Sequence, residues 1–424
     1  MYRWRSSLQT VWKILLLCSL LSPIAVHGQS LPLLQNGDRV VFVGGTFIER
    51  MQAHGYFETE LATRLHAKNL TFRNLGWSGD NVFGESRAVF GSIPDGYARL
   101  LRDLKLASPS VVVVHYGVVE ARQGRAGLAD FQKALSRFAD DIAKLDARMI
   151  LLLPRPQLEL GPPFPAAASF NKALELYRQT IKTFSENSPA TVVVLSEFVN
   201  GRISPAPVSS SRRSPFRDGP SLDGIQLTAE GYWRQAASLA TSFSGPRENV
   251  HVRLDVRKEQ GTATGGSFKL LACESGETRF EFRANSLPRT PSPDIAAGKD
   301  YLPGITITIK SLLPGRYEIT LGNGKAEVTS YTSRQMASGI VLPAPSSDQV
   351  AELQSAIARK NELFFHRYRP QNETYLFLFR KHEQGNNAVE IPMFDPLVEA
   401  LDRKIHHLSR PPLWQITIRR RPAR

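Results

Sequence analysis

The sequence alternates between strand-like and helix-like segments from residue 39 to residue 243. The clearest strand, at residues 111–114, is an unbroken run of valines, which is typical of a strand buried on both faces. The clearest helix, at residues 128–145, has apolar residues at helical spacing along one face. Strands that alternate with helices form a parallel sheet covered by helices on both faces. We therefore predict a three-layer α/β/α sandwich with a five-stranded parallel sheet.

The remaining elements of this domain follow from the same periodicities. The other expected strands are residues 40–43, 70–75, 149–153 and 191–195, and the other expected helices are residues 57–68, 97–106, 170–184 and 228–243. In a parallel sheet of this kind the active site lies beyond the carboxyl ends of the strands. Functional residues are therefore expected in the loops that follow the strands.

Residues 1–28 have the pattern of a secretory signal. Three basic residues precede a short apolar run at residues 14–26, and small or polar residues follow it. The run is shorter than the ~20 residues that span a bilayer, although a membrane anchor is the alternative interpretation. We expect a mature chain that begins near Gln29 or Ser30, is exported to the periplasm or the extracellular space, and has no stable membrane span. Its one remaining cysteine, Cys273, leaves no intrachain disulfide.

The pattern changes at Gly245. Residues 245–343 contain short alternating runs, such as residues 305–309, separated by turn residues, which predicts a small antiparallel β module. A helix is expected from Ser347, and the rest of residues 344–424 is polar and aromatic. The predicted organisation is thus a signal peptide at 1–28, an α/β domain at 30–244, the β module, and a helical and polar C-terminal extension.

The formal charge of +14 invites a nucleic-acid function. The basic residues are spread along the chain, however, and no nucleic-acid motif is present, so we expect no nucleic-acid partner. An attraction to an anionic polysaccharide or to a membrane surface is physically more plausible for an exported protein. The chain has no P-loop, no dinucleotide fingerprint and no metal-ligand spacing, so we expect no cofactor and no metal.

Four short blocks lie at the functional edge of the predicted sheet. They are Gly44-Gly45-Thr46 after the first strand, Asn74-Leu75-Gly76-Trp77-Ser78-Gly79-Asp80 after the second, Gly117-Val118-Val119-Glu120 after the third, and Asp223-Gly224-Ile225-Gln226 before the last helix. In order and position these blocks resemble those of the SGNH (GDSL-like) hydrolases. Residues 160–165 and 364–392 further resemble an exported bacterial subgroup with a C-terminal extension.

The resemblance implies an ester-hydrolysing site in which a serine attacks, a histidine moves the proton and an aspartate orients the histidine. In this sequence Thr46 stands at the serine position and Gln226 at the histidine position, while Asp223 is retained. Gly76 corresponds to an oxyanion glycine, and Val119 replaces the oxyanion asparagine next to Glu120. A glutamine amide does not accept a proton near neutral pH, and the loss of one oxyanion donor alone costs ~2.7–4 kcal/mol.

The resemblance therefore predicts a catalytically impaired or inactive member of the family that retains a cleft for a carbohydrate or an acylated glycan. One alternative is an active esterase or deacetylase with Thr46 as nucleophile and a base from elsewhere, for which His115, His366 and His382 are candidates. A second is an envelope scaffold in which the β module carries the function. A fold resemblance does not decide among these three.

Overall fold

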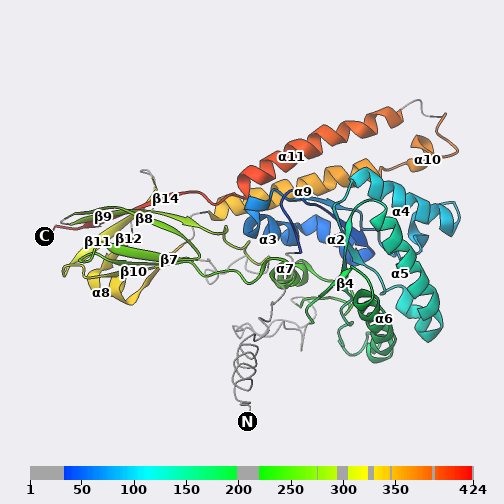
Figure 1. Cartoon of the computed structure of the whole chain (residues 1–424), viewed down its shortest axis with the longest axis horizontal. Coiled ribbons are helices and arrows are strands. Elements are labelled where there is room, and N and C mark those ends of the chain that lie inside the picture. Colours follow the sequence, from blue (N-terminus) through cyan, green and yellow to red (C-terminus); the bar gives the residue numbers. More distant parts are fainter. Residues whose placement is uncertain are drawn as a thin grey trace, which may run out of the picture. The chain divides into compact units, whose positions relative to one another are not determined.

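The computed structural model describes residues 33–197, 219–274, 276–293, 304–322, 329–343, 346–383 and 387–422 (Figure 1). The predicted signal peptide at residues 1–28 and most of the expected loop at residues 204–220 lie outside the described residues.

The predicted five-stranded parallel sheet is confirmed. Its strand order is β2-β1-β3-β4-β5, and each described pair is parallel. The strands are β1 (Arg39–Gly44), β2 (Thr71–Asn74), β3 (Val111–His115), β4 (Arg148–Leu153) and β5 (Thr191–Val194). Because all five run in the same direction, their carboxyl ends meet at one edge.

Helices cover both faces of this sheet. They are α2 (Thr46–His54), α3 (Tyr56–Arg64), α4 (Ile93–Ala107), α5 (Leu128–Ala143), α6 (Ala168–Glu186) and α7 (Ala229–Ser244). Five of them match expected helices to within a few residues at each end, whereas α2 was not predicted. Helix α2 has few apolar residues, and only Ile48 and Met51 are buried, so its sequence carries a weak helical signal.

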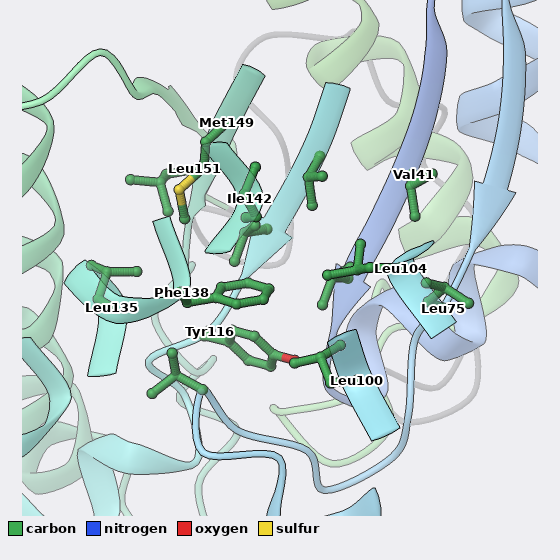
Figure 2. Packing of buried hydrophobic residues seen from close by; sticks show 14 of the residues in the cluster. Val41, Leu75, Leu100, Leu104, Tyr116, Leu135, Phe138, Ile142, Met149 and Leu151 are labelled. Atoms are coloured by element: carbon green, nitrogen blue, oxygen red, sulfur yellow. The ribbon is translucent and has the colours of Figure 1, made fainter. Parts of the chain in front are cut away.

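Alternate strand residues point to opposite faces, which gives the sheet two apolar layers. On one face, strand residues such as Val41 and Leu151 pack against Leu104 of α4 and Phe138 of α5 (Figure 2). On the other face, Phe42 packs edge-on against Phe57 of α3, which in turn contacts Phe243 of α7. The unbroken valine run of β3 is thus explained by burial on both sides.

Residues 251–343 form two sheets around a common apolar core. The strands are β6 (His251–Asp255), β7 (Gln260–Thr264), β8 (Gly266–Glu274), β9 (Glu277–Ala284), β10 (Gly304–Lys310), β11 (Arg316–Leu321), β12 (Thr329–Thr332) and β13 (Ile340–Pro343), with the short helix α8 (Ser333–Ser338) before β13. The described pairs are antiparallel, as expected, except that β6 and β10 run parallel. Ile305, Ile307 and Ile309 of β10 point into the core, as their alternation requires.

The C-terminal segment contributes to both the α/β domain and the β module. Its last strand, β14 (Trp414–Arg420), lies between β9 and β11 and buries Ile416 and Ile418 in the core of the β module. Its long helices, α9 (Ser347–Tyr368) and α11 (Phe394–Leu408), lie side by side (Figure 1). Leu363, Phe364 and Tyr368 of α9 join the core of the α/β domain. The short elements α10 (Glu373–Leu376) and η4 (Asn387–Met393) connect the two long helices.

Candidate functional site

A cavity of about 360 Å³ opens at the carboxyl edge of the parallel sheet. The segments that follow β1, β2, β3 and β4 contribute residues to its wall, and so does the segment before α7. Its lining residues are Gly45, Thr46, Phe47, Gly79, Asp80, His115, Tyr116, Val118, Val119, Glu120, Arg122, Arg155, Pro156, Gln157, Phe170, Ile225, Gln226, Leu227 and Tyr232. Of the predicted site residues, Thr46, Val119, Glu120 and Gln226 are brought together here, whereas Gly76 and Asp223 do not line the cavity.

Thr46 is the first residue of α2, directly after the end of β1. Gly44, the last residue of β1, lies so close to β3 that a Cβ atom would come within 2.6 Å of the His115 carbonyl oxygen, so a larger residue does not fit there. The Thr46 side chain is half-buried, and its hydroxyl accepts a hydrogen bond of 3.3 Å from the N–H of Gly79. The nucleophile position therefore faces a backbone donor.

The glycine at the cavity is Gly79 rather than the expected Gly76. The N–H of Gly76 donates to the side-chain oxygen of Asn74 at 2.8 Å, and a Cβ at Gly76 would come within 2.2 Å of the Glu49 nitrogen. Gly76 thus allows the segment after β2 to pack closely against α2. Gly79 has a left-handed φ of +76°, which glycine adopts readily, and presents its N–H to Thr46. The second glycine of the same sequence block was the signal that could have identified it.

Val119 and Glu120 have different surroundings although they are neighbours. Val119 is half-buried and brings an apolar side chain to the cavity. The Glu120 carboxylate is buried and accepts the N–H groups of Val82 at 2.9 Å and Gly117 at 2.8 Å. Burial raises the pKa of Glu120 to about 7 in spite of these donors. Glu120 thus joins the loops after β2 and β3, and its charge changes near neutral pH.

Asp223 forms a turn. Its Oδ1 atom accepts the N–H groups of Ile225 at 2.9 Å and Gln226 at 2.7 Å. This local pairing fixes the backbone that carries Gln226 into the cavity wall. The retained aspartate therefore has a structural task that does not depend on a histidine.

Arg155 also lines the cavity, although it lies outside the four sequence blocks. It follows β4, is buried, and donates hydrogen bonds to the carbonyl oxygens of Pro156 and Ile225. Burial lowers its pKa to about 10, which leaves the guanidinium charged at neutral pH. Its only signal in the sequence is its place directly after an expected strand, between two prolines.

His115 is the cavity-lining histidine among the described residues. It is the last residue of β3 and is buried, and the Phe47 ring lies 4.9 Å from its imidazole. Burial and then the nearby charge of Arg155 lower the pKa of His115 to about 3. The imidazole is consequently neutral and weakly basic. His366 and His382, the other two candidate bases, do not line the cavity.

A buried ion pair stabilises the loop that contains Gly79. Arg87 donates to Asp80 at 2.7 Å, and the Tyr116 hydroxyl donates to the same carboxylate oxygen at 2.8 Å. Helix α9 supports this loop as well, because the Tyr368 hydroxyl donates to the Gly76 carbonyl at 2.9 Å. Arg369 lies over the Trp77 ring at 3.6 Å. The end of α9 therefore supports the site without lining the cavity.

None of the helices in the described residues has the length and apolar composition of a membrane-spanning segment. No group of three histidine, cysteine or acidic residues in the described part of the chain is arranged to hold a metal ion.

No family model matches this sequence, and neither does any curated protein. Among solved structures, a gut microbial diltiazem-metabolizing enzyme is 14% identical and has a TM-score of 0.63 over 92% of this chain and 98% of that chain. An acetylxylan esterase from Geobacillus stearothermophilus is 17% identical over 38% of this chain and 76% of that chain, with a TM-score of 0.30. A lipolytic protein of the G-D-S-L family from Desulfitobacterium hafniense is 17% identical over 37% and 77%, with a TM-score of 0.27.

The likeness to the first of these structures extends over both bodies of the chain. Taken with the strand order of the parallel sheet and the four ordered sequence blocks at its carboxyl edge, it gives this chain an SGNH-like hydrolase fold.

Proposed function

We propose that this protein binds a ligand, of which a carbohydrate or an acylated glycan is the expected class, in its strand-end cavity without hydrolysing it. The supporting observation is that the Thr46 hydroxyl faces the Gly79 N–H, while Gln226, which the resemblance aligns with the histidine, lines the same cavity. A hydroxyl without a base is a weak nucleophile. The cavity itself is retained, and its volume lies within the range of about 300–1,000 Å³ that is usual for ligand pockets.

The nature of the cavity wall favours a ligand with both apolar and polar faces. Phe47, Phe170 and Tyr232 offer aromatic surface, as is common in ligand sites. Gln157 and Gln226 offer amides that donate and accept hydrogen bonds. A sugar ring has apolar C–H faces and a rim of hydroxyl groups, which this combination suits.

The competing function is catalysis on a small molecule. The fold likeness to a diltiazem-metabolizing enzyme is the reason to consider it. It would require a base for Thr46 from among the cavity residues. Of the histidines suggested by the sequence, His115 lines the cavity, but an imidazole with a pKa near 3 takes up protons poorly at neutral pH. The Glu120 carboxylate also lines the cavity, but its two oxygens already accept the N–H groups of Val82 and Gly117. We therefore place binding ahead of turnover.

An esterase assay with 4-nitrophenyl acetate distinguishes the two functions. We expect the turnover of the parent protein to equal that of Thr46→Ala. The matched control is Thr183→Ala, because Thr183 is exposed on α6 and does not line the cavity. Turnover that Thr46→Ala abolishes and Thr183→Ala leaves intact would establish hydrolysis and end the proposal. A glycan array with the exported protein then tests binding. Mass spectrometry of the N-terminus of the same protein tests the predicted signal cleavage.

A further inference from the structure

Large apolar side chains that are exposed to solvent gather at one end of the α/β domain. The described residues include sixteen strongly exposed large apolar side chains, and eight of these belong to two segments, residues 89–93 and 377–397. We call this set the apolar end, which consists of Val89, Phe90, Ile93, Phe377, Phe379, Val389, Met393 and Leu397. Single apolar residues on a surface are ordinary, whereas a concentration of this kind marks an interaction site.

The two segments lie side by side although they are far apart in the sequence. The Phe90 ring meets the Phe379 ring edge-on, with 5.9 Å between the ring centres. Close by, Arg99 on α4 forms an ion pair with Glu373, the first residue of α10. These contacts hold the connection between α9 and α11 beside the start of α4 (Figure 1).

The isolated chain gains little from this arrangement. Phe90 is 73% exposed and Phe379 is 66% exposed, so most of each ring remains in water. Val89, directly before Phe90, has a φ of +55°, a left-handed conformation that β-branched residues rarely adopt. Both features cost free energy, and a partner that covers the rings would recover part of it.

The exposed area of the apolar end fits a second protein surface. Its eight side chains belong to residues that are between 47% and 73% exposed. Because a large side chain offers roughly 150–250 Å², the set exposes roughly 700–900 Å². That area exceeds the largest apolar patch of a typical monomer, which is about 300–600 Å². It matches the about 800 Å² that each partner contributes to a stable interface of standard size.

The charge of this region favours a neutral partner over an anionic one. Residues 88–95 and 373–397 contain two basic and five acidic residues, which gives a formal charge of −3 in a chain of formal charge +14. Three of the acidic side chains are paired with arginines, in Arg99–Glu373, Arg380–Glu383 and Arg367–Asp395. An anionic membrane attracts basic segments, which this region is not. Two copies of a basic chain, in contrast, repel each other least where the charge is balanced.

We infer that the apolar end is the interface through which two copies of this chain associate. The same surface of each copy meets its counterpart across a twofold axis, as in most dimers of identical chains. The association covers the Phe90 and Phe379 rings of both copies. None of the eight residues lines the strand-end cavity, so this inference stands apart from the proposed binding function.

Sedimentation velocity of the exported protein tests the association. Across protein concentrations from about 0.1 to 100 µM, we expect an equilibrium between monomer and dimer. The association should not weaken when the salt concentration is raised, because salt screens attraction between charges and not apolar contact.

Two pairs of substitutions locate the interface. Phe90→Ser combined with Phe379→Ser should raise the dissociation constant of the dimer about tenfold or more, because buried aromatic side chains dominate interface energies. The matched control is Leu313→Ser combined with Val341→Ser, which removes two strongly exposed apolar side chains from the β module and should leave the constant unchanged. All four residues are exposed, so thermal unfolding of both variants should match that of the parent. Met393→Lys is an independent probe of the same surface and should also weaken the dimer.

Three outcomes would overturn the inference. A parent protein that remains monomeric over the whole concentration range is the first. The second is a dimer that both pairs of substitutions weaken equally, or that neither weakens, since the contact would then lie elsewhere. The third is a monomeric parent that sediments with phosphatidylcholine vesicles and loses this property in the Phe90→Ser, Phe379→Ser variant, which would assign the apolar end to a lipid surface.

Discussion

The ammonium group of Lys360 on α9 is fully buried and donates to the carboxylate of Glu58 on α3, 302 residues earlier in the chain. The same ammonium donates to the carbonyl oxygen of Phe72 in β2 at 3.0 Å. Arg73 and Asp402 form a second pair at 2.6 Å that joins β2 to α11. The C-terminal helices are thus tied to the α/β domain by buried charges as well as by apolar packing.

Removing one partner of this buried pair should destabilise the whole domain. We expect Lys360→Met to lower the free energy of unfolding by about 3–5 kcal/mol, because Glu58 is left buried without its cation. The matched control is Lys404→Met, whose pair with Glu352 is half exposed and should be worth at most about 1 kcal/mol. Urea unfolding followed by circular dichroism measures both. Similar losses in the two variants would mean that the Lys360 pair contributes no more than a surface contact.

Restoring SGNH chemistry should require several changes together. The variant Thr46→Ser, Val119→Asn, Gln226→His should gain measurable hydrolysis of 4-nitrophenyl acetate, because all three positions line one cavity and triad residues act as a unit. Gln226→His alone should do little. Gly45→Asp, which would complete the family block, is best left out because a Cβ at Gly45 would already lie 3.1 Å from the Asp80 carbonyl oxygen. A folded triple variant with no activity above that of the parent would refute the assignment of these positions.

The stability of the protein should depend on pH through Glu120. Its pKa in the folded protein is about 7, above the ordinary glutamate value of 4.5. Between these values the folded state keeps a proton that the unfolded state has lost, so this group's contribution to stability falls as pH rises from about 4.5 to about 7. Below that window both states are protonated, and above it both are ionised.

Substituting this residue tests the dependence. In Glu120→Gln the fall in stability across that window should be smaller than in the parent, because the titrating group is absent. Glu85→Gln is the control, since Glu85 is exposed in the loop after β2 and its loss should leave the shape of the parent's pH profile unchanged. Thermal unfolding at closely spaced pH values provides the measurement, and parallel profiles for all three proteins would contradict the role of Glu120.

Deleting β14 should unfold the β module. A chain that stops at Arg410 lacks the strand between β9 and β11 and exposes the core that Ile416 and Ile418 fill. A chain that stops at Arg421 keeps this strand and serves as the control. We expect rapid proteolysis of residues 251–343 in the shorter chain only. Equal protease resistance of the two chains would show that β14 is dispensable for the module.

The sequence alone determined the architecture of the α/β domain. The valine run of β3 and the amphipathic spacing of α5 each report burial through local periodicity, and the alternation of strands and helices implies a parallel sheet. It also placed Thr46, Val119 and Glu120 after strands, because blocks that follow parallel strands must meet at one edge, and it placed Gln226 just before the last helix.

Only the tertiary structure decided the rest, because those features depend on partners distant in the chain. Periodicity does not reveal that β14 pairs with β9, more than a hundred residues earlier, since strand pairing is not written in local spacing. Gly79 rather than Gly76 presents its N–H to Thr46, because Gly76 is packed against the backbone of Glu49. Arg155 becomes a cavity residue because the Ile225 carbonyl, far along the chain, accepts its hydrogen bond and holds its charge in the wall.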